Sequence, residues 1–501
     1  MMQLSKSDYM LFLRHPAWLW LKKHDKAKLP AVDEALQALF DDGKLFETYA
    51  DKLFPDAVRV GFSFEKRNYG SMPQRTKEVL QSGADTILQG RFEGEGITCI
   101  FDVLQKVGNN GYDLTEIKSS TEVKEDHILD LAFQTIVLEN AGLTIRKMFV
   151  IHVNNEYVRN GKININEMTA IDEITEQVRA QIDFTKEQIQ KALAVMNSSL
   201  PPSFSPRHVG IGPLSEWMAI YETLFPQTHS HSIYKLGRLN PQLVGQLEDL
   251  GIKHIADIPD TLELHIKQKL QIQVTKENKR IVDKKNIQEF LAKLVFPLYF
   301  FDYETFSTVI PPFDGIRPYQ QVPFQYSLHI IDKPGGIMTH KEFLHMHNSH
   351  PGLPLLQQLK KDIGDKGTVL VWYEPFEKGR NTELGEMFPE YAAFMAELNG
   401  RIIDLMVPFS NNWFVDKDFF GSASIKKVMP VLISELSYEK LEIQEGQTAS
   451  RTWKEHVLEG KHTEKKDTLP QQLLDYCRMD TLAMVKLYTF LKNLSLTPGL
   501  L

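Results

Sequence analysis

The most constraining feature of this sequence is an apolar run, Pro297 to Phe306, that contains two carboxylates two positions apart. The apolar residues favour a buried strand, and the side chains of a strand alternate between its two faces. Asp302 and Glu304 are therefore predicted to project from the same face of one strand. Oxygen ligands placed in this way are typical of a site for a hard divalent cation.

A second pair of functional side chains occurs near the C-terminus, where Tyr476 and Asp480 lie four residues apart. Apolar residues around them recur with helical spacing, so a helix is predicted there. Residues four apart share one helix face, which places the phenol beside the carboxylate. A strand with two acids and a helix with a third together predict a two-metal site.

These segments resemble the motifs of the 3′–5′ exonucleases of the DEDD group, which have an RNase H-like fold. In that group a strand carries Asp-x-Glu and the last helix carries Tyr-x-x-x-Asp, as at Asp302, Glu304, Tyr476 and Asp480. The resemblance implies an RNase H-like α/β domain over residues 296–501. It also implies two Mg²⁺ or Mn²⁺ ions in that domain and a role for Tyr476 in positioning the attacking water.

The third acid of this site has two candidates. Glu377 follows a predicted strand and stands at a predicted helix start, where the helix dipole favours an acid. Asp404 is its competitor, and we prefer Glu377. The segment 421–427 resembles the helix-opening segment before the last motif of the group, which implies that Lys426 or Lys427 lies near a phosphate.

A second constellation occurs in the N-terminal part. Two strands are predicted to pair around a turn at 108–111, with Asp102 on the first strand and Glu116 and Lys118 at the end of the second. Glu116 and Lys118 are two apart and so share a strand face. In such a cluster the acids bind a metal ion, while the ammonium polarises the attacking water or the scissile phosphate.

This constellation resembles the PD-(D/E)XK nucleases of the RecB-like branch over residues 1–200. The resemblance implies a restriction-endonuclease-like α/β core with one or two Mg²⁺ or Mn²⁺ ions, Glu47 as a further ligand and Gln134 as a substrate contact. Relatives often hold an iron–sulfur cluster with four cysteines. This chain has two, Cys99 and Cys477, so no such cluster is expected.

The segment between these parts is predicted to be helical over 207–295, after a turn-rich linker at 197–206 and a long helical pattern at 171–196. Gly251 lies between two short amphipathic stretches that resemble a helix-hairpin-helix. The predicted fold class is thus multidomain α/β. The order of the three parts resembles a group of uncharacterised bacterial proteins.

Composition restricts the function class only weakly. The chain has 501 residues, of which 42% are hydrophobic, and a net charge of −8. This charge is not that of a protein that coats nucleic acid in bulk, although it is compatible with a nuclease whose metal sites use carboxylates. No apolar stretch is long enough for a membrane span, and two cysteines fit a reducing compartment. A cytoplasmic protein without a membrane partner is expected.

Together these patterns predict a metal-dependent nuclease that hydrolyses DNA phosphodiester bonds. We expect it to act from strand ends as an exonuclease, in defence or in DNA repair. DNA is preferred to RNA as the nucleic-acid partner, and no protein partner is predicted. Two alternatives stay open. One is a nucleic-acid-binding scaffold in which one or both sites are inactive, and the other is a 3′–5′ RNA exonuclease.

Overall fold

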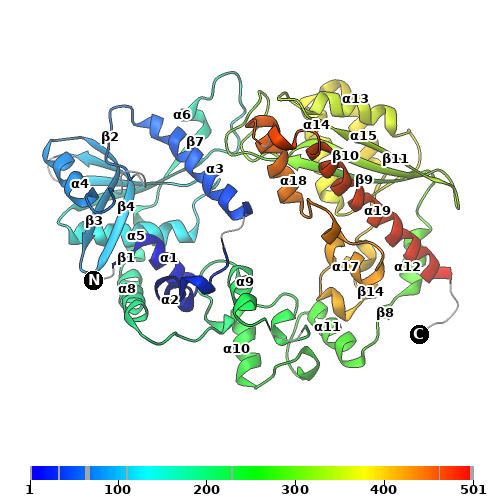
Figure 1. Ribbon diagram of the computed structural model, residues 1–501, viewed down its shortest axis with the longest axis horizontal. Helices are drawn as coiled ribbons and strands as arrows, with labels where there is room; N and C mark the ends of the chain where they lie inside the picture. Colours follow the sequence, from blue (N-terminus) through cyan, green and yellow to red (C-terminus); the bar gives the residue numbers. More distant parts are fainter. Residues whose placement is uncertain are drawn as a thin grey trace. The chain divides into compact units, whose positions relative to one another are not determined.

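Two β-sheets organise the computed structural model, which describes residues 3–31, 34–62, 68–108, 111–226, 230–461 and 463–496 (Figure 1). The chain divides into two compact units. Unit 1 comprises Met1–Thr228, Asn240–Gly245 and Thr308–Tyr319, and unit 2 comprises His229–Leu239, Gln246–Ser307 and Gln320–Leu501. The protein therefore has the multidomain α/β fold that the sequence predicts, and the predicted helical middle segment 207–295 is shared between the two units.

Unit 1 is built on a mixed sheet with the strand order β2-β3-β4-β5-β6-β7, with β1 paired to β4. The strands are β1 Leu4–Ser5, β2 Val58–Arg59, β3 Thr86–Gly94, β4 Ile97–Val107, β5 Gly111–Ile117, β6 Thr144–Val153 and β7 Thr169–Glu173. Strands β4 and β5 are antiparallel, which confirms the predicted pairing. Two residues of the predicted turn, 109 and 110, lie outside the described residues.

Helices pack against this sheet through a core of aliphatic and aromatic side chains. The helices that matter for the site are α1 Lys6–Arg14, α3 Glu34–Ala50 and α5 Glu125–Asn140. Helix α5 is buried along most of its length, including Gln134 and Asp130. Two polar side chains so deep in a helix need partners in the protein, because an unpaired buried polar group is costly.

The long helix predicted at 171–196 is wrong in its first part. Residues Thr169–Glu173 form strand β7, and the helical part is split into α7 Thr175–Ala180 and α8 Ile182–Asn197. Strand β7 pairs with β6, for example Ile171 with Ile151. The free edge of β6 satisfies the backbone groups of β7, and this long-range pairing overrides the local helical pattern.

The described part of the middle segment consists mainly of helices joined by loops, and it contains the strand β8. Its helices are α9 Leu214–Leu224, α10 Pro241–Asp249, α11 Ile266–Glu277 and α12 Lys284–Leu291, and β8 Ile281–Val282 pairs with β14 Phe414–Val415. Gly251 has a positive φ of 69° after α10. The second stretch of the predicted hairpin is a 3₁₀ turn, Ile255–Asp257, in place of an α-helix.

Unit 2 is built on a second mixed sheet with the strand order β11-β10-β9-β12-β13. The strands are β9 Leu298–Phe306, β10 Val322–Ile331, β11 Met338–Leu344, β12 Thr368–Val371 and β13 Ile402–Asp404. The first three are antiparallel neighbours, whereas β9, β12 and β13 run parallel. The predicted strand with two acids is thus confirmed as β9, in the middle of the sheet.

Strand β9 is covered on both faces, which explains its apolar sequence. Its odd-numbered residues from Tyr299 to Tyr303 pack against the helices α13 Gly352–Asp362, α14 Glu374–Met387 and α15 Ala392–Gly400. Its other face meets α19 Leu469–Leu496, the red helix in Figure 1. Phe300, for example, lies 5.7 Å from Tyr488 of α19 between ring centroids. Asp302 and Glu304 therefore project toward α19.

Candidate functional site

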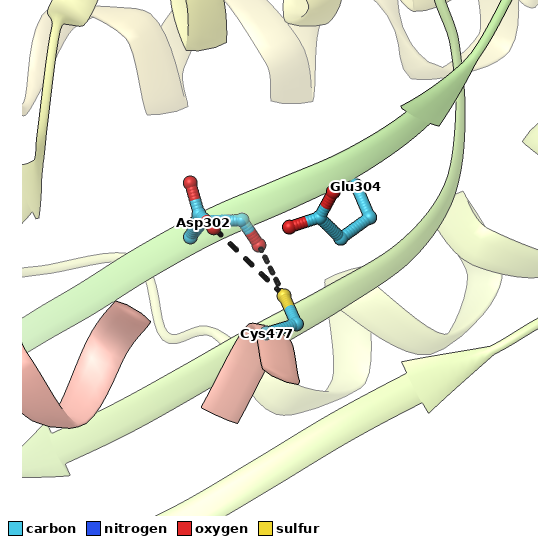
Figure 2. Close-up of side chains that lie close together, drawn as sticks. All are labelled: Asp302, Glu304 and Cys477. Carbon is cyan, nitrogen blue, oxygen red and sulfur yellow. Dashed lines mark hydrogen bonds between the residues drawn. The ribbon is translucent and has the colours of Figure 1, made fainter. Parts of the chain in front are cut away.

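The acids of β9 lie in the interior of unit 2, and Glu304 is only 7% exposed. In register, Asp302 stands beside Ser327 of β10 and Glu304 beside Gln325. Helix α19 places Cys477 over this part of the strand, as Figure 2 shows. The Cys477 thiol lies 3.9 Å from Asp302 Oδ2 and 3.8 Å from the Asp302 carbonyl oxygen.

Helix α19 also supplies Tyr476 and Asp480, both of which are buried. The two residues lie one turn apart on the same helix face, as their spacing predicts, and the Asp480 charge acts on Tyr476. A second phenol reaches the same carboxylate, because the Tyr438 hydroxyl donates to Asp480 Oδ1. Gly446 approaches from α18 Gly446–Trp453, and a Cβ built there would lie 3.7 Å from both Glu304 Oε2 and the Tyr476 hydroxyl.

The structure separates the two candidates for the third acid. Glu377, on the first turn of α14, faces Asp302, and burial together with the Asp302 charge raises the pKa of Glu377. Its side chain is buried, and Oε2 has no hydrogen-bond partner among the described residues. The geometry thus brings Glu377 to the acids of β9 and leaves one of its oxygens available.

Asp404 instead satisfies the start of helix α14. Its Oδ1 accepts from the backbone N–H groups of Tyr373 at 3.1 Å and Met406 at 2.8 Å, and its Oδ2 accepts from Glu374 N–H at 3.1 Å. The first N–H groups of a helix have no partner inside the helix, so a carboxylate here acts as a cap. Tyr373 adopts a positive φ of 86° at this junction.

Burial and mutual repulsion raise the pKa values of these acids. The pKa values of Asp302, Glu304 and Glu377 lie well above their usual range, because each is desolvated and each faces another carboxylate. Burial raises the pKa of Asp480 to about 6, against the opposing effect of the Tyr438 hydrogen bond and the Lys426 charge. Without a bound cation, these carboxyl groups must retain protons to be accommodated in the interior of the protein.

A cavity of about 200 Å³ opens onto this cluster. It is lined by Asp302, Tyr303, Glu304, Trp372, Ser424, Ile425, Lys426, Tyr476, Asp480 and Met484. The structure therefore brings Lys426 to the site. Its Nζ donates to Gln444 O at 3.0 Å and lies 5.4 Å from the ring centroid of Tyr476. Lys427 is exposed and does not line the cavity.

Burial also keeps the phenols protonated. The pKa of Tyr476 is raised by desolvation and by the neighbouring charges of Asp480 and Glu304. The same causes, led by desolvation and Asp480, raise the pKa of Tyr438. Both hydroxyl groups are therefore donors at neutral pH, and neither can act as a base in this state.

The N-terminal cluster lies at the β4–β5 pair of unit 1. The register pairs Val103 with Thr115, which places Asp102 opposite Glu116. Asp102 Oδ2 accepts from the Ile117 backbone N–H at 2.8 Å. The two predicted acids thus come together on adjacent strands, as the sequence indicates.

Two ammonium groups meet at Glu116. Its Oε1 lies 2.8 Å from Lys118 Nζ and 2.7 Å from Lys6 Nζ. Lys118 also pairs with Asp130 of α5 at 2.8 Å, and Lys6 lies 3.5 Å from the same carboxylate. The predicted lysine is therefore one of two, and Lys6 comes from the first turn of α1. A cation is disfavoured there by the helix dipole, and its two acidic partners compensate for that cost.

Two amide side chains complete the cluster. Gln134 donates to Glu116 Oε2 at 2.7 Å and to Asp130 Oδ1 at 2.8 Å. Gln89 of β3 donates to Glu47 Oε1 at 2.7 Å and to Asp102 Oδ1 at 2.9 Å. Glu47, from α3, thus reaches the cluster through Gln89. Gln134 is here a partner of the acids and lies in the interior.

The electrostatics of this cluster are asymmetric. Burial and the Glu116 charge raise the pKa of Asp102 to about 8. For Glu116 desolvation is outweighed by the two lysines, which lower its pKa. Glu116 is therefore ionised, whereas Asp102 holds a proton near neutral pH. Glu47 has a raised pKa, chiefly through burial.

A cavity of about 830 Å³ adjoins the cluster. Its lining includes the four acids Glu47, Asp51, Asp102 and Glu116, the cations Lys44, Arg59 and Lys118, and the exposed side chains of Leu39 and Phe40. It is lined by charges of both signs.

Several of these contacts were not predicted. Lys6, Gln89 and Tyr438 come from segments far in sequence from the acids they touch, and only the fold brings them together. Asp130 carries a local signal, since Asp130 and Gln134 are four apart and share a helix face. Cys477 lies one residue from Tyr476; it is buried, and its side chain faces Asp302.

The donor set of unit 2 fits a divalent cation. Asp302, Glu304 and Cys477 can each offer one ligand atom within 4.8 Å of the others. Glu377 and Asp480 add two more buried carboxyl groups, and none of the four acids forms an ion pair with a lysine or arginine among the described residues. Buried carboxylates without a cationic partner are stabilised by a metal ion.

The comparisons with known proteins give no activity. A family described as a domain of unknown function, DUF2779, matches residues 299–424. Uncharacterized protein MG366 of Mycoplasma genitalium is 26% identical over 215 residues, and its homolog in Mycoplasma pneumoniae is 25% identical over 214 residues. Each match takes in 39% of this chain and 32% of the relative, so the match spans about a third of these relatives.

One solved structure, the crystal structure of SSO0001, is similar over 34% of this chain and 91% of its own, with 12% identity and a TM-score of 0.15. A TM-score this low carries no argument about the fold. In the part of the chain that the structure describes, no helix has both the length and the apolar character needed to cross a membrane.

Proposed function

We propose that this protein is a metal-dependent nuclease that hydrolyses DNA phosphodiester bonds, with its principal active site in unit 2. The observation that carries the proposal is the cluster of four carboxyl groups at Asp302, Glu304, Glu377 and Asp480. The last three are buried. Asp302, Glu304 and Asp480 line the cavity, and Lys426 is the one cation among the described lining residues. An enzyme interior tolerates such a cluster where a cation is bound, and perturbed acids in a cleft favour a catalytic role.

Asp302, Glu304, Glu377 and Asp480 would hold Mg²⁺ or Mn²⁺, ions that prefer oxygen ligands. When bound, two such ions stabilise the attacking and leaving oxygens of a phosphodiester in an in-line displacement. Side chains of the protein would orient the attacking water and the phosphate. Tyr476 lines the cavity together with Glu304 and Asp480, and its protonated hydroxyl would donate a hydrogen bond to a water or phosphate oxygen there.

Lys426 gives this cavity a positive charge at its wall. An ammonium beside the acids attracts the phosphate backbone and compensates its charge. Lys426 is held in place through Gln444 O and faces the aromatic rings of Tyr438 and Tyr476. These restraints favour one orientation of the nucleic acid over others. Attack from strand ends, in defence or repair, is the form of the activity that we propose.

The unit 1 cluster supports a second, distinct proposal. Glu116 is already neutralised by Lys6 and Lys118 and bonded by Gln134. It has less need of a metal ion than the acids of unit 2. Unit 1 is therefore either a second nuclease site that uses Asp102, Glu116 and Lys118, or a nucleic-acid-binding platform without catalysis.

The test compares wild type, Glu304→Gln and Lys118→Met on end-labelled single- and double-stranded DNA and RNA, in Mg²⁺ or Mn²⁺. We expect stepwise shortening of DNA by wild type and its loss in Glu304→Gln. If Lys118→Met cleaves as well as wild type but binds DNA more weakly, unit 1 is a binding platform. Absence of cleavage under every condition overturns the nuclease proposal. Preferential cleavage of RNA would show that the substrate is RNA and not DNA.

A further inference from the structure

Cys477 is a soft donor in a site of hard donors. Its thiol projects from α19 toward Asp302 of β9, with Glu304 beside it (Figure 2). Carboxylates suit Mg²⁺ and Mn²⁺, whereas a thiolate favours zinc and the metals that resemble it. A cysteine at this place therefore changes which cations the site can hold.

The spacing of these donors suits a small tetrahedral ion. Zn–S and Zn–O bonds of about 2.3 Å and 2.0 Å imply a sulfur–oxygen edge of about 3.5 Å in a tetrahedron. The observed distance from Cys477 Sγ to Asp302 Oδ2 is 3.9 Å. The ligand atoms of Asp302, Glu304 and Cys477 lie within 4.8 Å of one another. The observed sulfur–oxygen distance thus exceeds the tetrahedral edge by about 0.4 Å.

A second observation points to a ligand at the same place. Glu377 Oε2 is buried and has no hydrogen-bond partner among the described residues. Glu377 faces Asp302, the residue that Cys477 also contacts. Asp302 thus lies between a thiol and a carboxyl group with an unused oxygen. The cysteine is therefore one of three possible ligands from β9 and α19, and Glu377 of α14 adds a buried carboxyl group beside Asp302.

We propose that the unit 2 site binds a thiophilic divalent cation of the Zn²⁺ class through Cys477 together with Asp302 and Glu304. Binding replaces the S–H bond by a metal–sulfur bond, and the proton is released to solvent. Because Asp302 and Glu304 are the acids assigned to Mg²⁺ or Mn²⁺, the two classes of cation compete. The competition rests on the proposed function of this site, whereas the binding does not.

The binding is tested with Cd²⁺, which reports a thiolate ligand by a sulfur-to-metal charge-transfer band in the ultraviolet. Metal-free full-length protein is titrated with CdCl₂, and the dissociation constant is measured by calorimetry. The chain offers a matched control, since Cys99 is the other cysteine and is buried in the unit 1 core. We expect the band in wild type and in Cys99→Ala, and its loss in Cys477→Ser.

The affinity for Cd²⁺ is expected to fall at least tenfold in Cys477→Ser and in Glu304→Gln, while Mn²⁺ affinity changes little in Cys477→Ser. Far-ultraviolet circular dichroism and the thermal midpoint establish that each variant folds. Should Cys477→Ser fail to fold, Glu304→Gln carries the test, because the charge-transfer band must weaken at equal Cd²⁺ concentration. A band that persists in Cys477→Ser, or that disappears in Cys99→Ala, overturns the proposal.

The two proposals fail in different ways. If Mn²⁺-dependent cleavage requires Glu304 but Cd²⁺ gives no charge-transfer band, the thiophilic site is excluded and the nuclease remains. If the band depends on Cys477 but no nucleic acid is cleaved, the metal site remains and the nuclease is excluded. If both hold, Zn²⁺ should raise the Mn²⁺ concentration needed for half-maximal cleavage in wild type, and much less in Cys477→Ser.

Discussion

At the scale of single residues, two acids of similar sequence context have opposite tasks. Glu377 and Asp404 both stand near the end of a parallel strand, which made them competitors for one role. Asp404 is saturated by three backbone N–H groups and holds the start of α14. Glu377 has an oxygen without a partner among the described residues. A carboxylate that caps a helix stabilises the fold, whereas one that faces other carboxylates destabilises it.

This difference predicts opposite effects on stability. Asp404→Ala removes the acceptor of three N–H groups and should lower the free energy of unfolding by about 1–3 kcal/mol. Glu377→Gln relieves repulsion and should raise it by about 0.5–2 kcal/mol in metal-free protein at pH 8. Urea denaturation followed by circular dichroism measures both. Mn²⁺ affinity should fall in Glu377→Gln alone, and a loss of Mn²⁺ binding in folded Asp404→Ala contradicts the assignment.

Asp102 predicts a pH dependence of stability. Its pKa is raised from 3.8 to about 8 in the folded protein, mainly by burial and by Glu116. Between about pH 4 and pH 8 the folded state holds a proton that the unfolded chain has released, so the free energy of unfolding falls as pH rises. The slope is at most about 1.4 kcal/mol per pH unit. Below this window Asp102 makes no such contribution, since both states are protonated.

Asp102→Asn removes this contribution. In EDTA, the difference in free energy of unfolding between Asp102→Asn and wild type should grow in favour of the variant from pH 5 to pH 8. Asp56→Asn, at an exposed position, controls for the loss of one carboxylate. The prediction fails if the difference is independent of pH or has the opposite slope.

At the scale of elements, a buried polar stripe sets the position of α19. Three residues of β10 that lie two apart, Gln325, Ser327 and His329, face this helix. Gln325 donates to Leu473 O at 2.8 Å. Thr481 Oγ1 lies 2.7 Å from Ser327 Oγ and 2.8 Å from His329 Nδ1. A helix packed only by apolar contacts can slide, whereas these bonds fix the register that brings Asp480 to the acids of β9.

Loss of the stripe should therefore affect both stability and the site. Thr481→Val keeps the side-chain shape but leaves Ser327 and His329 without this partner, which should cost about 1–3 kcal/mol. Mn²⁺ affinity should fall as well, although Thr481 is no ligand. Thr489→Val is the matched control on the same helix, because Thr489 bonds only to Val485 O of its own helix among the contacts found.

A double-mutant cycle isolates the bond between the two elements. Ser327→Ala and Thr481→Val each remove one partner, so their effects on unfolding should be less than additive, with a coupling energy of about 0.5–3 kcal/mol. Denaturation of the two single variants and the double variant gives this energy directly. Full additivity would show that the bond does not hold the helix.

The elements also show what sequence can predict. The strand β9 and the helix α19 follow from local periodicity. The sequence could therefore predict that Asp302 and Glu304 share a strand face, and that Tyr476 and Asp480 share a helix face. Strand β7 could not be predicted from the sequence, because its place depends on the edge of β6. The role of Gln89 could not be predicted either. It occupies a positive φ of 54° inside β3, and only the fold explains a strained glutamine between two acids.

At the scale of the whole molecule, the multidomain α/β class was predictable from alternating elements and from two separate acidic patterns. The assignment of residues to the two units could not be predicted from the sequence. Residues Thr308–Tyr319 belong to unit 1 although they are inserted between β9 and β10 of unit 2. Val309 and Tyr319 pack in a core with Phe46 and Ile151, and Tyr319 donates to Ser119 O. An apolar loop of this kind gives no periodic signal that indicates its partner.

Each unit contains every residue of its own cluster, which predicts that the two sites bind metal independently. Sites that share no partners have additive energies. Mn²⁺ binding, followed by electron paramagnetic resonance of the free ion, should lose only the unit 2 contribution in Glu304→Gln. Asp102→Asn should lose only the Mn²⁺ binding by unit 1, and the double variant should lose the Mn²⁺ binding by both units. If Glu304→Gln instead abolishes binding by both clusters, the sites are coupled, and a cation in one must then stabilise the other.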